Sequence, residues 1–186
     1  SGKKRKKRKQ IFPRFHQLRT VRALLRRAHN DGVGKRYLIQ HSAGSGKSNT
    51  IAWLAHQLVE LRRKDDPLAV QFDSIIVITD RRALDSQIAR TIKGYDHVAA
   101  IFGHSDNAQE LREYLRRGKK IIVTTVQKFP FILDELGDLS GKSFALLIDE
   151  AHSSQGGKTT ARMHEALGGK AADALIAGEL DAAVTT

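Results

Sequence analysis

The sequence predicts an α/β domain built on a mostly parallel, doubly wound β-sheet flanked by helices. Short apolar segments rich in β-branched residues alternate along the chain with amphipathic helical segments. The short segments are apolar at successive positions and do not alternate with polar residues, which is typical of strands that helices cover on both faces. We therefore expect a layered fold with right-handed crossover connections.

Helix patterns and strand patterns follow one another in a regular order. A helix is expected first, over residues 15–30, because apolar residues recur there at helical spacing between arginines. The glycines of DGVGK, residues 31–35, interrupt that pattern. Apolar, β-branched runs predict strands at residues 37–40, 75–79, 97–102, 121–125 and 144–149. Amphipathic patterns predict helices between them, around residues 51–61, 81–92, 111–115 and 126–136.

The composition excludes several classes of protein. The chain has 186 residues, of which 40% are hydrophobic and 28% charged, and this fits one globular domain with a sizeable core. It has no cysteine, so a disulfide scaffold and a thiolate metal site are excluded. The longest apolar runs, such as FALLI at residues 144–148, are too short for a transmembrane helix or the apolar region of a signal peptide.

Positive charge is concentrated at the start of the chain. The net charge is +12, yet residues 1–40 hold 14 Lys and Arg against one acid, and residues 41–186 hold 18 against 19. The run KKRKKRK repels itself, so residues 1–10 are expected to form a disordered basic arm. The arm fits a solubilising tail, a tag remnant, a linker, a nuclear import signal or a binder of phosphate backbone, and the run alone does not separate these readings.

A small-residue loop between a predicted strand and a predicted helix indicates a phosphate site. Gly44 and Gly46 allow the backbone to wrap a phosphate, Lys47 supplies a charge for the β- and γ-oxygens, and the Ser48 hydroxyl suits Mg²⁺. His41 stands where the G-x-x-x-x-G-K-[ST] pattern has its first glycine. The predicted nucleotide-binding residues of this loop are His41, Ser42, Ala43, Gly44, Ser45, Gly46, Lys47 and Ser48.

An acid pair at the end of the last predicted strand supplies the second half of the site. In LLIDEAH, Asp149 and Glu150 follow an apolar run, at the sheet edge where ligands of open α/β folds bind. Asp149 is expected to hold Mg²⁺ with Ser48, and Glu150 to orient and deprotonate an attacking water. The two half-sites together predict binding and hydrolysis of ATP or GTP.

These motifs resemble the first RecA-like domain of superfamily-two helicases and translocases, a P-loop NTPase fold, with HSAGSGKS and a DEAH box. More narrowly, four segments look like the motor domain of the restriction subunit of type I restriction–modification enzymes. The resemblance covers residues 11–167, and residues 168–186 read as a weakly ordered tail or a truncation point. The four segments are GKRYLIQHSAGSGKSNTIAWLAHQL, VITDRRALDSQ, GKKIIVTTVQKFPFIL and LIDEAHSSQGG.

The resemblance implies further residue roles. Gln17 matches a glutamine that reads the adenine edge, which favours ATP. Positions that face the nucleic-acid backbone match Thr79, Asp80, Arg81, Thr124, Thr125, Gln127 and Lys128. Without the resemblance, helix capping by Thr or Asp explains several of these residues equally well. His152 and Gln155 match residues that couple the nucleotide state to a second motor domain, and His152 is grouped with Lys47 and the acid pair as catalytic.

The resemblance also implies partners and missing parts. The intact machine would be a type I site-specific deoxyribonuclease in the prokaryotic cytoplasm, which moves double-stranded DNA with ATP and Mg²⁺. Its partners would be methyltransferase and specificity subunits. The family's subunit also has a nuclease domain and a second RecA-like domain, and neither is recognised in this sequence. We therefore expect this polypeptide alone to bind Mg-ATP and to hydrolyse it slowly, without translocation.

Two other functions stay open at this point. One is a DEAH-type superfamily-two helicase of other specificity, such as one that acts on RNA. The other is a non-catalytic nucleotide- or nucleic-acid-binding module that kept the fold and lost turnover.

Overall fold

The computed structural model of the chain describes residues 11–42, 44–79, 88–89, 91–92, 102–105, 107–125, 127–128 and 141–149. All strand pairs in these residues are parallel, and the four strands lie in the order β2-β3-β1-β4. The predicted parallel sheet is therefore confirmed. In chain order the elements are α1 (Phe15–Asp31), α2 (Lys47–Val59), β1 (Ser74–Thr79), β2 (Phe102–His104), α4 (Ala108–Arg116), β3 (Ile121–Thr125) and β4 (Phe144–Ile148).

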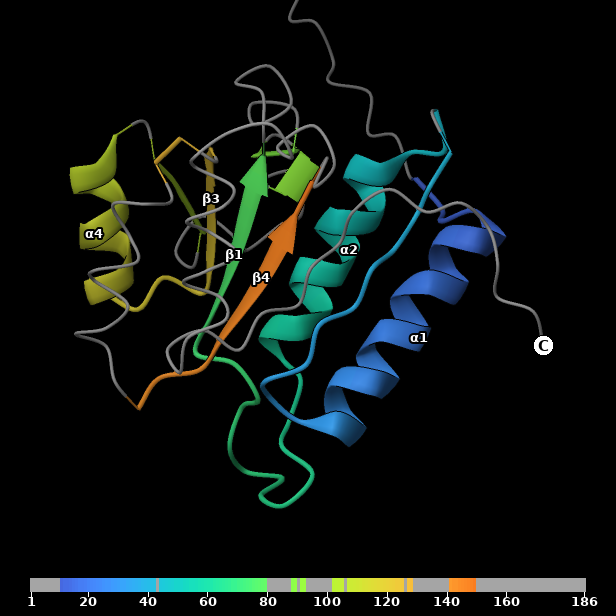
Figure 1. Cartoon of the computed structure of the whole chain (residues 1–186), viewed down its shortest axis with the longest axis horizontal. Coiled ribbons are helices and arrows are strands. Elements are labelled where there is room, and N and C mark those ends of the chain that lie inside the picture. The colour runs from blue at the N-terminus through green and yellow to red at the C-terminus, as the bar shows by residue number, and fades with distance from the viewer. Residues whose placement is uncertain are drawn as a thin grey trace, which may run out of the picture.

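Helices cover both faces of the sheet. The helix α2 packs on β1, β3 and β4, whereas α4 packs on β2 and β3. Figure 1 shows these two helices on opposite sides of the sheet, with α1 outside α2 and away from the strands. The molecule is thus layered in the order α4, sheet, α2, α1. Among the described elements, the outermost helix packs mainly on α2.

The pleat of the strands explains the two faces. Ile75 and Val77 of β1 belong to the apolar cluster that includes the inner side of α2, whereas Ile76 and Ile78 are equally buried and lie outside that cluster. Each such side chain stabilises the fold by about 1.5–3 kcal/mol when fully buried. Trp53, half-buried on α2, packs against the same cluster.

On the other face, β2 and α4 approach closely. A Cβ added to Gly103 would lie 2.6 Å from the ring of Tyr114, a distance that real side chains do not reach. A glycine at this strand position therefore allows the aromatic ring to pack directly on the backbone.

Three predicted elements differ from the structure or are only partly described. Residues 37–40 are extended but form no strand, since no described segment pairs with them and only Ile39 of the run is buried. The third predicted strand is described from Phe102 and continues to His104, with residues 97–101 outside the described residues. The predicted helix at 126–136 is described only at Gln127 and Lys128, which form a turn. No helix in the described part of the chain is both long and apolar enough to cross a membrane.

Candidate nucleotide-binding site

The loop before α2 has the backbone shape that the sequence predicts for a phosphate site. Gly44 and Gly46 have φ angles of 74° and 85°, in the left-handed region that favours glycine. The Ser45 N–H donates to the Ser42 carbonyl oxygen at 3.2 Å, which closes the turn. Gly46 is the N-cap of α2, so the loop leads directly into the first turn of the helix. Figure 1 shows this first turn at the same end of the molecule as the arrowheads of β1 and β4.

The N-terminus of α2 is not capped by a side chain of its N-cap residue. Gly46 has no side chain to accept a hydrogen bond there. By contrast, α4 is capped by Asn107, whose Oδ1 accepts from the Glu110 N–H at 2.9 Å. The positive end of the α2 dipole therefore faces the loop, where it favours an anion.

The side chain of Gln17, on α1, is hydrogen-bonded to the backbone of the loop. Its Nε2 donates to the carbonyl oxygens of Ser45 and Gly46, both at 3.0 Å, and its Oε1 accepts from the Arg14 N–H at 2.8 Å. The side chain is 3% exposed, so these bonds satisfy a buried amide. A Cβ at Gly46 would lie 2.5 Å from Gln17 Nε2, so this position needs glycine for space as well as for φ.

The predicted contact of Gln17 with adenine stays a prediction. Both amide hydrogens are directed to loop carbonyl oxygens in this structure. A bond from Nε2 to a base would therefore have to replace one of them. The family resemblance implies a contact of Gln17 with the nucleotide. The sequence has no pattern that predicts its hydrogen bonds to Ser45 and Gly46, which are 28 and 29 positions away.

Two histidines lie beside the loop. His16 Nε2 donates to the Ser45 carbonyl oxygen at 3.2 Å, and its ring meets that of His41 edge-on with centroids 5.9 Å apart. Burial lowers the pKa of His41 below its usual 6.5, and the nearby charges of His16 and Lys47 lower it further. His41 is therefore neutral near pH 7. The sequence analysis did not single out His16, although it precedes Gln17 on the same helical turn.

Several buried polar atoms near this end of the sheet have no hydrogen-bond partner in the described part of the chain. A buried polar group without a partner is costly, and a polar ligand can supply the missing bonds. Two of these atoms belong to the loop itself, and a third is on the first turn of α2. The atoms are His41 Nε2, Ser45 Oγ, Thr50 Oγ1 and Thr79 Oγ1.

Asp149 directly follows β4 and is placed as the sequence predicts. Its N–H donates to the Ile78 carbonyl oxygen at 2.9 Å, which fixes it beside the end of β1, and the residue is 6% exposed. A carboxylate in such a position suits a hard cation. The Ser48 hydroxyl at the start of α2 is the other predicted ligand, and the role of both residues toward Mg²⁺ stays a prediction. No group of three or more His, Asp or Glu side chains among the described residues forms a protein-only metal cage.

The predicted nucleic-acid contacts divide into buried and exposed residues. Thr79 and Thr124 are fully buried and Thr125 is 2% exposed. A nucleic acid could therefore contact these hydroxyls only if the residues that cover the ends of β1 and β3 moved away. Thr124 Oγ1 instead accepts from Ser105 Oγ at 3.1 Å. Gln127 is exposed, whereas Lys128 is half-buried.

Lys128 is held in place by the neighbouring strand end. Its Nζ donates to the Ser105 carbonyl oxygen, and its N–H donates to that of Thr125 at 3.0 Å. Ser105, which the sequence analysis missed, therefore organises this corner through its side chain and its backbone. All five predicted contacts in this part of the chain stay predictions.

Six predicted site residues lie outside the described residues. They include one residue of the loop and the second acid of the DEAH box. The six are Ala43, Asp80, Arg81, Glu150, His152 and Gln155.

Comparison with known sequences gives consistent matches. The model of the SWI2/SNF2 ATPase family matches residues 16–175. A Mycoplasma pneumoniae protein assigned to the C-terminal part of the type I restriction enzyme MpnIIP endonuclease subunit is 31% identical over 136 residues, which are 68% of this chain and 61% of that protein. The type I restriction enzyme HindI endonuclease subunit of Haemophilus influenzae is 31% identical over 64% of this chain and 11% of its own length. The chain thus spans only part of these relatives.

Solved structures share the fold. The Hef helicase domain of Pyrococcus furiosus covers 94% of this chain and 33% of its own, with a TM-score of 0.64 and 18% identity. A nuclease-deletion mutant of the Type ISP restriction–modification enzyme LlaGI, in complex with a DNA substrate mimic, covers 89% of this chain and 15% of its own, with a TM-score of 0.62 and 13% identity. With the parallel sheet, these matches confirm the predicted RecA-like fold.

Proposed function

Because the chain belongs to the SWI2/SNF2 ATPase family, we propose that it is the ATP-binding half of a motor that moves double-stranded DNA. We assign this motor to the restriction subunit of a type I restriction–modification enzyme. Relatives described as endonuclease subunits of such enzymes support the assignment. The expected partners are a second RecA-like domain and the methyltransferase and specificity subunits, in the cytoplasm of a prokaryote.

The observation that carries the proposal is the glycine turn that leads into α2, at the end of the sheet where Asp149 follows β4. In the proposed mechanism the loop N–H groups and Lys47 hold the triphosphate, while Gln17 keeps the loop in its turn. Ser48 and Asp149 would hold Mg²⁺, which supplies charge neutralisation at the phosphate oxygens. Glu150 would orient the attacking water and accept its proton.

Binding of a fluorescent nucleotide tests the site. We expect the chain to bind mant-ATP in the presence of Mg²⁺, and Lys47→Ala to weaken binding by at least about tenfold, because the charge at the phosphates is lost. Lys142→Ala, which removes an exposed Lys just before β4, is the matched control and should bind as the unchanged protein does. Equal binding by the Lys47→Ala variant and the unchanged protein would refute the proposed pocket. If neither the unchanged protein nor Lys47→Ala binds mant-ATP, the result would favour a non-catalytic module that kept only the fold.

Stimulation of ATP hydrolysis tests the nucleic-acid partner separately. We expect duplex DNA to stimulate the ATPase of the intact enzyme more than single-stranded RNA does, with an effect that weakens as salt rises. Preferential stimulation by single-stranded RNA would favour a helicase of other specificity.

A further inference from the structure

The outer surface of α1 has a ridge and grooves of the kind by which helices pack against one another. Phe15, Arg19, Ala23 and Arg27 are spaced four residues apart, so they form one ridge along the helix, and all four are exposed. The residues that α1 buries are on its other side: Gln17, Val21, Leu24 and Ala28.

A groove runs along each side of this ridge. One groove, of about 450 Å³, lies wholly on α1. The other, of about 410 Å³, lies between α1 and residues 37–40, and is floored by apolar side chains that include Leu24 and Ile39. Ala23 lines both grooves, so the smallest side chain of the ridge stands where a partner could approach the backbone of α1 most closely.

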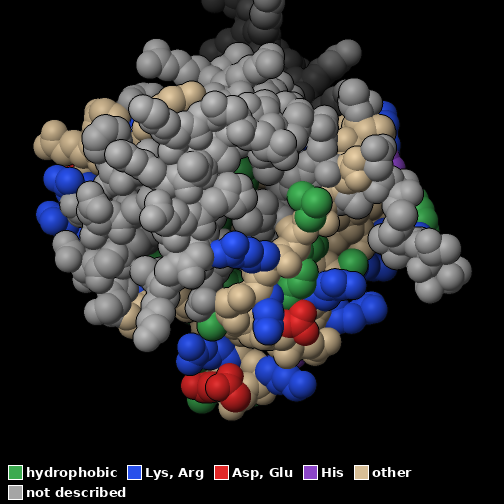
Figure 2. Space-filling model, in the orientation of Figure 1, with side chains coloured by type: hydrophobic (Ala, Val, Ile, Leu, Met, Phe, Trp, Pro, Cys, Tyr) green, Lys and Arg blue, Asp and Glu red, His purple; other side chains and the backbone are tan. Residues whose placement is uncertain are grey.

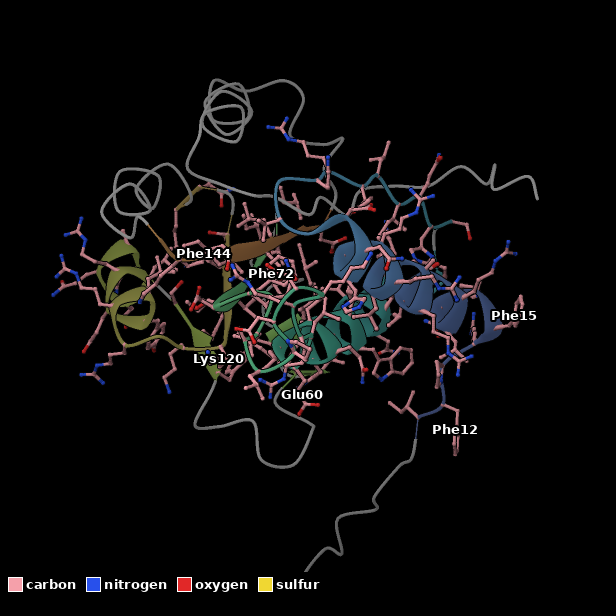
Figure 3. All side chains as sticks on the ribbon, turned by 90° about the horizontal axis from the view of Figure 1, so that it is seen from below. Phe12, Phe15, Glu60, Phe72, Lys120 and Phe144 are labelled. Atoms are coloured by element: carbon pink, nitrogen blue, oxygen red, sulfur yellow. The ribbon has the colours of Figure 1, made fainter. Side chains whose placement is uncertain are left out.

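Large apolar side chains are exposed around these grooves. Phe12 and Phe15 are 75% and 78% exposed, and Leu38 is 74% exposed. Figure 3 shows Phe12 and Phe15 at the outer end of α1, pointing away from the body of the protein. Exposed aromatic residues grouped with arginines are typical of the centre of protein interfaces.

The charge around the grooves has one sign. Arg19, Arg22 and Arg26 are exposed, and no carboxylate in the described part of the chain pairs with them. The one acid of α1, Asp31, accepts a hydrogen bond from the Tyr37 hydroxyl at 2.6 Å. Figure 2 shows Lys and Arg side chains over this part of the molecule, with hydrophobic side chains and an acidic one among them.

We propose that the ridge and grooves of α1 dock an acidic amphipathic helix of a separate partner protein. The partner's apolar ridge would fill a groove beside Ala23, and its Asp and Glu side chains would pair with Arg19, Arg22 and Arg26. A second copy of this chain does not fit, because it would place arginines against arginines. Nucleic acid fits less well, since a phosphate backbone gives Phe15 and the apolar groove floors nothing to bury against.

The experiment uses the full chain and a synthetic acidic helix as the probe. The probe is a fluorescent peptide of about five helical turns, with Leu four residues apart and Glu beside them. Its counterpart carries Lys in place of Glu, and duplex DNA is the third probe. Binding is read as fluorescence anisotropy. One variant, Ala23→Trp, fills both grooves without a change in charge, and a second removes three charges with Arg19→Gln, Arg22→Gln and Arg26→Gln.

A matched control comes from the opposite side of the protein. Arg112, Arg116 and Arg117 lie on or just after α4, next to Glu110 and Glu113, and their replacement by Gln removes the same charge. We expect the acidic peptide to bind, both α1 variants to weaken binding by about tenfold or more, and the α4 variant to change it less than about twofold. These variants are at exposed positions, and far-UV circular dichroism verifies that each is folded.

Three results would overturn the proposal. The first is no binding of the acidic peptide. The second is equal binding of the Lys counterpart. The third is a pair of observations: duplex DNA binds and this binding is lost in the variant without the three α1 arginines, and Ala23→Trp leaves binding of the acidic peptide unchanged. That result would make the surface a nucleic-acid site. The test does not use nucleotide, so its failure is distinguishable from failure of the proposed ATP site.

Discussion

At the scale of single residues, the loop is built from groups that leave little freedom. Gly46 has a left-handed φ of 85° and faces Gln17 Nε2, so a larger residue there would be strained and would also collide. His41 is held neutral beside Lys47 because burial and neighbouring positive charge both disfavour its protonated form. The loop therefore keeps Lys47 as its cation and adds a histidine that titrates below the usual range.

The lowered pKa of His41 predicts how stability depends on pH. Below about pH 6.5 the unfolded chain takes up a proton at this histidine that the folded protein does not, so the free energy of unfolding falls as the pH drops through that value. His56, whose pKa burial also lowers, contributes with the same sign. Urea unfolding at pH 7.5 and 5.5 should show a smaller loss of stability for His41→Gln than for the unchanged protein. An identical loss in both proteins would contradict the prediction.

At the scale of elements, α1 and the loop form one unit although they are far apart in sequence. The hydrogen bonds from Gln17 and His16 connect the first turn of α1 to the Ser45 and Gly46 carbonyl oxygens. The position of α1 and the shape of the loop before α2 are therefore linked directly, in addition to the packing of α1 on α2.

Gln17→Glu should weaken this link. The new carboxylate has almost the same shape but donates no hydrogen bond, so it would face two carbonyl oxygens in a buried position. We expect a loss of about 1–3 kcal/mol in unfolding free energy and weaker mant-ATP binding, measured by urea unfolding and by fluorescence titration. Gln57→Glu on the exposed side of α2 is the matched control and should change neither quantity appreciably. Unchanged stability in Gln17→Glu would show that the hydrogen bonds contribute nothing net.

The sequence predicts those elements that depend on local pattern. Strands β1, β3 and β4 agree with their predicted ranges to within one residue, because each is apolar on both faces. Residues 37–40 have the same local pattern and are no strand, since pairing depends on a neighbour that local sequence does not specify. The glycine-rich loop before α2 and the position of Asp149 follow from motifs, whereas the contacts of Gln17 and Ser105 join distant residues and leave no periodic signal.

At the scale of the whole molecule, charge is distributed unevenly along the chain. Positive charge is concentrated in residues 1–40, which include α1, while the nearly neutral residues 41–186 include the strands, the glycine-rich loop and Asp149. The chain spans 61% of one relative and 12% and 11% of two others, so the complete enzymes contain much more than this domain.

Because the chain covers only part of its relatives, we consider how fast it hydrolyses ATP without the remaining domains. In related nucleotide hydrolases an arginine from an opposing domain or partner contributes on the order of 10³–10⁵ to the rate, and in this family the second RecA-like domain is expected to supply it. We predict that the polypeptide alone binds Mg-ATP and hydrolyses it on the order of a thousandfold or more below the complete enzyme. Phosphate release with and without duplex DNA is the measurement. Strong stimulation of ATP hydrolysis by DNA in the isolated chain would show that the domain needs no arginine from a second RecA-like domain.

The one tryptophan of the chain gives this architecture a built-in optical reporter. Trp53 is on the helix that begins at the proposed ATP site, about 9 Å along the axis from Lys47, and is only half-buried. Its emission comes from a single known position, so stopped-flow mixing can follow rearrangements of this helix in real time without any attached dye.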